Sequence, residues 1–202
     1  MGQLLVLKKL LENMHSQTYL ALLRGINVGG KSMIKMADLR DALTASGLKD
    51  VQSYIQSGNV IFTAPKATDE RRLEKQIHDC IKQQFKLEVA VVVLSKQAWS
   101  DIISNAPAWW GVDGDWKHNL LVAIQPATAA QVVEAIGVLK PDIERVEAGK
   151  GAVYQSILFE KFGRTSSGKL ASLPIYKNLT IRNYNTAQKL QTLLNQIDSI
   201  TS

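Results

Sequence analysis

The strongest constraint on the fold is an order of strands and helices that occurs twice along the chain. In the first half, a strand at 18–24 and a helix at 36–47 precede two strands, a helix at 68–86 and a strand at 89–94. The two middle strands, "VQSYIQ" and "NVIFTA", are joined by Ser57-Gly58, a pair typical of a tight hairpin. This β-α-β-β-α-β order is that of the ferredoxin-like unit, an α+β arrangement.

The second half repeats the order with a weaker second helix. The strand "NLLVAIQ" precedes the helix "AAQVVEAIGVLK", which Thr128 is predicted to cap, and "IERVEA" and "AVYQSILF" pair across a Gly-Lys-Gly turn. Pro174 interrupts the next helical segment, and a short strand "LTIR" follows it. A last helix is expected near 186–198, with Asn185 and Gln188 spaced as a capping box.

We therefore predict two ferredoxin-like (βαββαβ) domains, each with an antiparallel sheet and helices on one face, plus a C-terminal helix. The predicted boundaries are an N-terminal extension at 1–16, domain 1 at 17–106, a linker at 107–117 and domain 2 at 118–202. Met1 and Met14 are both candidate natural starts, because the patterned fold begins only near Thr18.

Composition limits the compartment and the partners. No apolar run approaches the roughly 20 residues that cross a bilayer, so no membrane partner is expected. A single cysteine, Cys80, excludes an internal disulfide and favours a cytoplasmic location. It falls between Ile77 and Ile81 on the apolar face of a helix, where we expect a buried structural thiol.

The net charge of +6 is concentrated in one part of the chain. Residues 150–189 hold seven basic residues and one acidic residue, Glu160, so the remainder is neutral. Such a region suggests an anionic ligand or partner, and a solvated basic surface is an equal alternative.

The segment "GINVGGKS" at 25–32 matches the phosphate-loop pattern G-x-x-x-x-G-K-[ST]. A working phosphate loop needs its helix to start within the loop, yet the periodic face begins only at Met36. The apolar strands also end without the acidic residue that would bind magnesium. We predict that the protein is not a phosphate-loop NTPase, and that Gly29-Gly30 forms either an anion-binding nest or an ordinary crossover turn.

Other common chemistries have no signature in the sequence. His15, His78 and His118 are scattered without metal-ligand spacing, and no nucleophile elbow occurs, so we predict no metal site and name no catalytic residue or cofactor. Nucleic acid is a possible but not a favoured partner, because a sheet that reads RNA needs aromatic residues to stack on bases, and "VAVVVL" has none while "NVIFT" offers only Phe62.

The chain resembles a known bacterial family at both ends of its patterned region. The segments "YLALLRGINVGGKSMIKMADLRDAL" and "VQSYIQSGNVIF" are similar to the opening signature of domain of unknown function 1697 (DUF 1697). The segment "FGRTSSGKLASLPIYKNLTIRNYNTAQKL" is similar to its closing signature. The resemblance implies two ferredoxin-like domains and no established activity.

Our leading hypothesis is a protein that binds a phosphorylated or otherwise anionic small molecule between its two domains. An enzyme of unknown reaction that uses the same polar loops, and a nucleic-acid or protein interaction module, remain alternatives. The sequence does not identify the oligomeric state. The predicted ligand-binding residues are Arg24, Asn27, Gly29, Gly30, Lys31, Gln56, Ser57 and Asn59 in the first domain, and Arg164, Lys169, Arg182 and Asn183 in the second.

Overall fold

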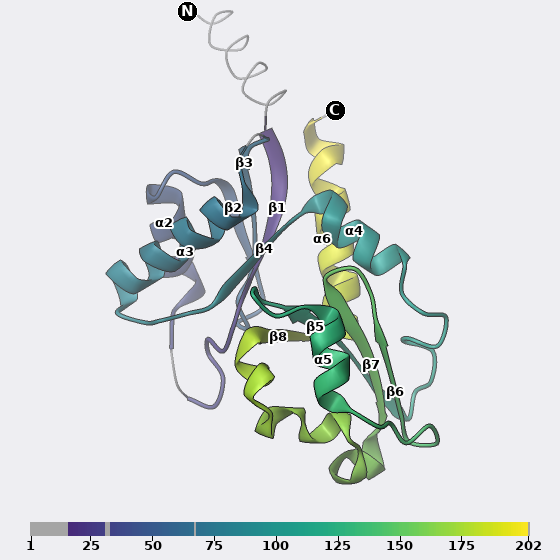
Figure 1. Cartoon of the computed structure of the whole chain (residues 1–202). Coiled ribbons are helices and arrows are strands. Elements are labelled where there is room, and N and C mark those ends of the chain that lie inside the picture. The colour runs from purple at the N-terminus through teal and green to yellow at the C-terminus, as the bar shows by residue number, and fades with distance from the viewer. Residues whose placement is uncertain (1–15, 31–32, 67, 202) are drawn as a thin grey trace, which may run out of the picture. The chain divides into compact units, whose positions relative to one another are not determined.

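The computed structural model describes residues 16–30, 33–66 and 68–201 (Figure 1). It is an α+β structure with two antiparallel four-stranded sheets. The chain divides into two compact units between Gln97 and Ala98, and each unit contains one sheet. Residues 1–15 of the predicted extension, both candidate start methionines and Lys31 lie outside the described residues.

The first unit follows the predicted order of elements, and its sheet has the strand order β2-β3-β1-β4. The central strand β1 pairs antiparallel with both neighbours, so that Leu20 stands opposite Ile61 of β3 and Leu94 of β4. The elements are β1 (Ser16–Leu23), α2 (Met36–Ala45), β2 (Lys49–Tyr54), β3 (Asn59–Pro65), α3 (Glu70–Phe85) and β4 (Val91–Ser95).

Both helices of the first unit cover one face of its sheet. Tyr19 and Leu23 of β1 point to this face and pack in one core with Leu39 of α2 and Ile77 of α3. The alternate residues Leu20 and Leu22 are also fully buried, so β1 is buried on both faces. That explains why "YLALL" is a continuous apolar run rather than an alternating one.

The edge strand β4 is protected by carboxylates from α3. The N–H of Val93 donates to Glu74 at 3.0 Å, and the N–H of Ser95 donates to Glu70 at 2.8 Å. Burial raises the pKa of Glu74, although the hydrogen bond from Val93 acts in the opposite direction. These bonds use donors that an exposed sheet edge would otherwise offer to another strand.

The second unit has the strand order β6-β7-β5-β8, again antiparallel throughout. Its elements, with the helix that spans the division between the units, are α4 (Lys96–Ser104), β5 (Trp116–Ala123), α5 (Ala129–Ile136), β6 (Glu144–Ala148), β7 (Ala152–Leu158), the 3-10 helices η1 (Phe159–Arg164), η2 (Ser167–Ser172) and η3 (Pro174–Asn178), β8 (Leu179–Asn183) and α6 (Tyr184–Thr201).

Several elements of this unit differ from the sequence prediction. The helix α4 was not predicted, although Trp99 and Ile102 supply a short buried face. The Thr128 cap is confirmed, but α5 ends before Lys140 because Gly137 adopts a φ of 75° and stops it. The predicted interruption at Pro174 is also confirmed, because the segment forms short 3-10 helices and Pro174 begins η3.

The predicted cap of the C-terminal helix is wrong. The carboxamide oxygen of Asn183 accepts the N–H of Thr186 at 2.8 Å, and α6 begins at Tyr184. The helix therefore follows β8 directly, and Asn185 lies inside it. Asn183, two residues before Asn185, provides the cap, because it ends β8 and its side chain folds over the first turn of the helix.

The second sheet carries helical elements on both faces, whereas helices on one face were expected. Val132 of α5 and Leu170 of η2 pack with Leu121 on one face. On the other face, the ring of Tyr154 packs edge-on against Trp110 at 5.5 Å, and its hydroxyl donates to the Ile102 carbonyl of α4. None of the helices in the described ranges is long and apolar enough to span a membrane.

The hairpin turn of the first unit generates a stability prediction. Gly58 has a φ of +76°, and a Cβ there would lie 2.7 Å from the Cβ of Leu23. Gly25 has a similar φ of +72° but open space around its Cβ position. We expect Gly25→Ala to cost about 1 kcal/mol through the backbone alone, and Gly58→Ala to cost about 2–4 kcal/mol because overpacking is added.

Chemical denaturation of the two variants measures this difference. If both variants lose the same unfolding free energy, the close approach of Gly58 to Leu23 is not what restricts position 58 to glycine.

Candidate functional site

The side chain of Asn27 joins three segments of the first unit. Its amide nitrogen donates to the carbonyls of Ile34 and Gln56, both at 2.9 Å, and its carboxamide oxygen accepts the N–H of Ile34 at 2.7 Å. Asn27 itself has a φ of 55°, a left-handed conformation that asparagine tolerates better than most residues. The loop after β1, the approach to α2 and the turn after β2 are thereby held together.

These three segments surround a cavity of about 760 Å³, which we call the loop pocket. That volume lies in the usual range for small-molecule sites, about 300–1,000 Å³. The structure thus brings two predicted ligand-binding residues, Asn27 and Gln56, to one cavity. Its lining residues are Asn27, Met33, Ile34, Lys35, Met36, Ala37, Ser53, Ile55 and Gln56.

The loop pocket has a positive wall at the start of α2. Lys35 is the N-cap residue, and its side chain makes no capping hydrogen bond among the described residues. The first intrahelical bond runs from Leu39 to the Lys35 carbonyl, so the N–H groups of the first turn point out of the helix. Arg40 adds a second cation beside this wall, because it donates to the Ser53 hydroxyl at 2.8 Å.

The rest of the loop pocket is lined mainly by apolar side chains. The side chains of Met33 and Ile55 are 66% and 48% exposed, which is unusual for residues of this size. Both line the pocket with the half-buried Met36. An apolar rim around a few polar and cationic groups is the usual composition of a small-molecule site.

The other described residues of the predicted site in the first unit do not line this pocket. Arg24 is half-buried at the end of β1, and Gly29 and Gly30 are exposed with positive φ angles. The buried Asn59 donates to the Tyr54 carbonyl and the Ser57 hydroxyl, so these two predicted ligand residues close the turn between β2 and β3.

The elements that flank the segment 25–32 are not those that flank a phosphate loop. The helix α2 begins at Met36, after the Lys-Ser pair rather than within the loop, as the sequence predicts. The preceding strand β1 pairs with antiparallel neighbours on both sides, whereas phosphate loops follow strands of parallel sheets.

In the second unit, the donor-rich loop "TSSG" is already occupied by an anion of the protein itself. The carboxylate of Glu144, which is 1% exposed, accepts the N–H groups of Ser166 and Ser167 at 2.9 and 2.8 Å. It also accepts the Ser167 hydroxyl at 2.7 Å and the Lys140 N–H at 3.0 Å. Donors that resembled a free anion site in the sequence therefore bind Glu144.

This arrangement controls the ionisation of Glu144. Burial raises the pKa of the carboxyl group, but the hydrogen bonds from Ser167, Ser166 and Lys140 outweigh it, so the pKa is lowered below its ordinary value. Glu144 is therefore a charged structural residue at neutral pH, and it fixes the path of the chain between η1 and η2.

The four predicted residues of the second unit lie in different environments. Arg164 and Lys169 are exposed, whereas Asn183 caps α6. Arg182 is 6% exposed and donates to the Thr180 hydroxyl and the Ile181 carbonyl, both at 2.8 Å. Burial lowers the pKa of Arg182 to about 10.

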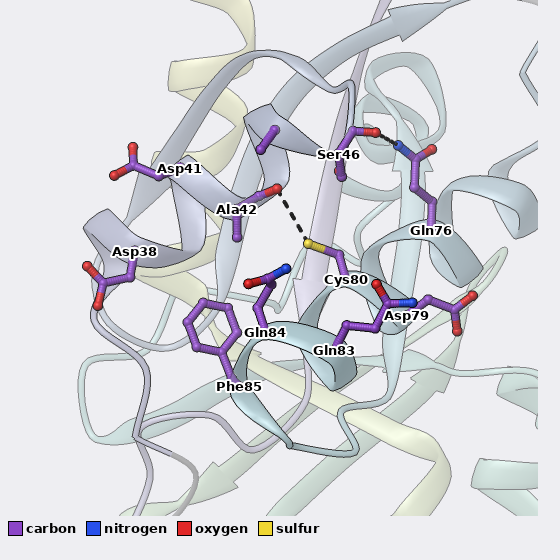
Figure 2. Close-up of a pocket in the computed structure, with 11 residues that line it drawn as sticks. Asp38, Asp41, Ala42, Ser46, Gln76, Asp79, Cys80, Gln83, Gln84 and Phe85 are labelled. Atoms are coloured by element: carbon purple, nitrogen blue, oxygen red, sulfur yellow. Dashed lines mark hydrogen bonds between the residues drawn. The ribbon is translucent and has the colours of Figure 1, made fainter.

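A second cavity lies between α2 and α3, with Cys80 among its lining residues (Figure 2). Asp38, Asp41 and Asp79 also line it, which makes it unsuitable for an anion. The Cys80 thiol is buried and contacts the Ala42 carbonyl at 3.5 Å. Burial raises the pKa of Cys80, so the thiol form dominates and the prediction of a structural cysteine is supported.

The histidines of the described region make protein contacts rather than a metal site. His118 places Nδ1 2.6 Å from the hydroxyl of the fully buried Ser156 and Nε2 3.0 Å from the Asp113 carbonyl. No group of three or more His, Cys, Asp or Glu side chains within the described residues could hold a metal ion.

Sequence reasoning missed the residues that define both loops. Lys35, Met33 and Ile55 were not predicted, although an apolar residue beside the Ser57-Gly58 turn was a usable signal for Ile55. Glu144 stands in a short strand with alternating polarity, and only its inward position distinguishes it from Glu147. That position depends on the register with β7, where Glu144 faces Ile157.

Comparison with known proteins identifies the family. The sequence profile described as "Protein of unknown function (DUF1697)" matches residues 16–154, more than half of the chain. The chain belongs to the DUF1697 family. The matched region contains the loop pocket and Glu144, and it ends before the closing segment that resembles the family signature.

A solved structure supports the assignment of this DUF1697 protein. The chain is similar to the conserved bacterial protein SP0830 from Streptococcus pneumoniae, with 31% sequence identity and a TM-score of 0.78. The similarity covers 89% of this chain and 99% of that protein. A comparison with curated proteins gave no match.

Two variants of Asn27 separate the contribution of its side-chain hydrogen bonds to stability from the backbone cost of its positive φ. Asn27→Gly removes the side-chain hydrogen bonds but suits the positive φ, and we expect a loss of about 1–3 kcal/mol. Asn27→Ala removes the same bonds and adds a backbone cost, so it should lose about 1 kcal/mol more. Urea denaturation measures both, and a fully stable Asn27→Gly variant would contradict the bracing role.

The Glu144 contacts predict a pH effect. Because the folded-state pKa is lowered, Glu144 stabilises the fold above its unfolded pKa, about 4.3, and this contribution is lost as the pH falls through the folded value. We expect Glu144→Gln to lower stability at neutral pH and to reduce the acid dependence of unfolding, measured by thermal melts across pH.

Glu147→Gln is the matched control, because Glu147 lies on the same strand and is exposed. If both variants have the same melting profile, the hydrogen bonds of the buried carboxylate do not contribute to stability.

Proposed function

We propose that this DUF1697 protein binds a small anionic molecule, such as a phosphorylated metabolite, in the loop pocket of its first unit. The observation that carries the proposal is the combination of a 760 Å³ cavity with the uncapped start of α2 and Lys35 on one wall. Helix N-termini favour negative charge through their free N–H groups and dipole.

The composition of the loop pocket supports this type of ligand. Lys35 and the first turn of α2 would bind the anionic group, and the Gln56 side chain would add a neutral donor or acceptor. Met33 and Ile55 would cover an apolar part of the molecule. Asn27 would act as a positioning residue, because its polar atoms are already bonded to Ile34 and Gln56.

Two further assignments accompany this function. We infer that both units are ferredoxin-like, which is supported by the strand orders β2-β3-β1-β4 and β6-β7-β5-β8 and by the β-α-β-β-α-β order of the first unit. The second unit would be a variant in which 3-10 segments replace one helix. A cytoplasmic location is supported by the single, buried cysteine.

Ligand screening tests the proposed function. Inorganic phosphate, nucleoside monophosphates and sugar phosphates are added to the full chain, and melting temperature and calorimetric affinity are measured. We expect at least one phosphate compound to raise the melting temperature. Lys35→Ala should weaken its binding at least about fivefold, and Lys35→Arg should retain part of it, because a charge-assisted hydrogen bond is worth about 1.5–3 kcal/mol.

The control variant is Lys75→Ala, which removes an exposed lysine on α3 that pairs with Asp79. This variant should bind as the unchanged protein does. Failure of every phosphate compound to bind, or equal affinity of the Lys35→Ala variant, would overturn the proposed site.

A further inference from the structure

Two phenylalanine rings are exposed on the 3-10 helix η1 of the second unit. Phe159 is 68% exposed and Phe162 is 45% exposed, whereas most large apolar side chains of the protein are buried. The N–H of Phe159 donates to the Asp115 carbonyl at 3.1 Å, so η1 starts beside the first residue of β5, Trp116. Aromatic side chains thus gather at one end of the second sheet.

Basic side chains lie near Phe162, whereas the acidic residues Asp115 and Glu160 are next to Phe159. The ammonium group of Lys117 lies 5.9 Å from the ring centre of Phe162. Arg164 is exposed at the end of η1, and Lys140 donates to the Arg164 carbonyl. We call Phe159, Phe162, Lys117, Arg164 and Lys140 the η1 surface. Glu160 is the one acidic residue of η1 itself.

The η1 surface differs from the two features already described. Its cations are not consumed by Glu144, because that carboxylate binds backbone N–H groups and the Ser167 hydroxyl. Its rings do not line the loop pocket, which belongs to the first unit. Exposed rings beside exposed cations therefore need an explanation of their own.

We propose that the η1 surface binds single-stranded nucleic acid, with bases stacked on Phe159 and Phe162 and phosphates beside Lys117 and Arg164. Sequence-tolerant single-strand binding requires aromatic faces together with a basic track for the backbone. The 3-10 helix η1 itself carries two basic residues, Lys161 and Arg164, against one acidic residue, Glu160.

The rings of the η1 surface are not on the face of a sheet. Tyr19, Phe62 and Tyr154 of the central strands β1, β3 and β7 are buried and cannot stack on bases, whereas Phe159 and Phe162 lie beyond the end of β7. An acidic protein segment without apolar side chains would use the cations but not the ring faces. Single strands use both features, and the proposal does not depend on the ligand of the loop pocket.

Fluorescence anisotropy with labelled oligouridine and oligodeoxythymidine tests the proposal on the full chain. We expect binding that weakens as salt increases. The double variant Phe159→Ala/Phe162→Ala should weaken binding at least about tenfold, because each stacked base contributes strongly. Lys117→Ala should weaken binding. It should also reduce the slope of log affinity against log salt concentration by about 1, as expected for the loss of one phosphate contact.

Two further variants serve as controls: one should raise the affinity and the other should leave it unchanged. Glu160→Gln removes a negative charge from η1 and should raise affinity about two- to fivefold. Val138→Ala truncates another apolar side chain of the second unit, 89% exposed, and should leave affinity unchanged. Because all these side chains are exposed or half-buried, unchanged melting temperatures would show that the variants fold.

The proposal is overturned if single strands do not bind at low salt, or if the ring variants bind as tightly as the unchanged protein. It is also overturned if an acidic polypeptide binds more tightly than either oligonucleotide, which would assign the surface to a protein partner.

Discussion

The hydrogen bonds of Asn27 are the contact on which the candidate site depends. One carboxamide holds the Ile34 backbone on one side and the Gln56 carbonyl on the other, across segments that are far apart in the sequence. The loop pocket exists because these segments are kept at a fixed separation. A side chain with both a donor and an acceptor is needed for this, and asparagine also tolerates the left-handed backbone at this position.

In the second unit, the buried carboxylate of Glu144 holds the loop between η1 and η2 in place. Glu144 loses hydration on burial, and the free-energy cost of that loss is offset because its oxygens accept four hydrogen bonds, two of them from consecutive N–H groups. The two polar loops therefore have different consequences. The loop after β1 leaves a cavity with a positive wall, whereas the loop between η1 and η2 closes around an internal carboxylate and leaves its cations at the surface.

Most strands and helices could be predicted from periodicity, since β1, β3, α3, β5 and β7 have clear apolar patterns. The exceptions are short or ambiguous. The nine residues of α4 supply only a brief apolar face, and the start of α6 was misplaced because two asparagines could cap it. Of the site, Asn27 and Gln56 were identified from polar loop residues. Lys35 and Met33 were not, because their place in the pocket depends on the bonds that join Asn27 to Ile34 and Gln56.

The sequence by itself determined the α+β class, the order of elements in the first unit, the buried thiol and the late start of the helix after "GINVGGKS". These follow from local patterns of apolar, glycine and proline residues, which act over one element at a time. Only the tertiary structure decided which polar groups are free to bind a partner. Hydrogen bonds between distant residues, such as Glu144 to Ser167 and Asn27 to Gln56, remove donors from some loops and leave others open, and no local pattern records that choice.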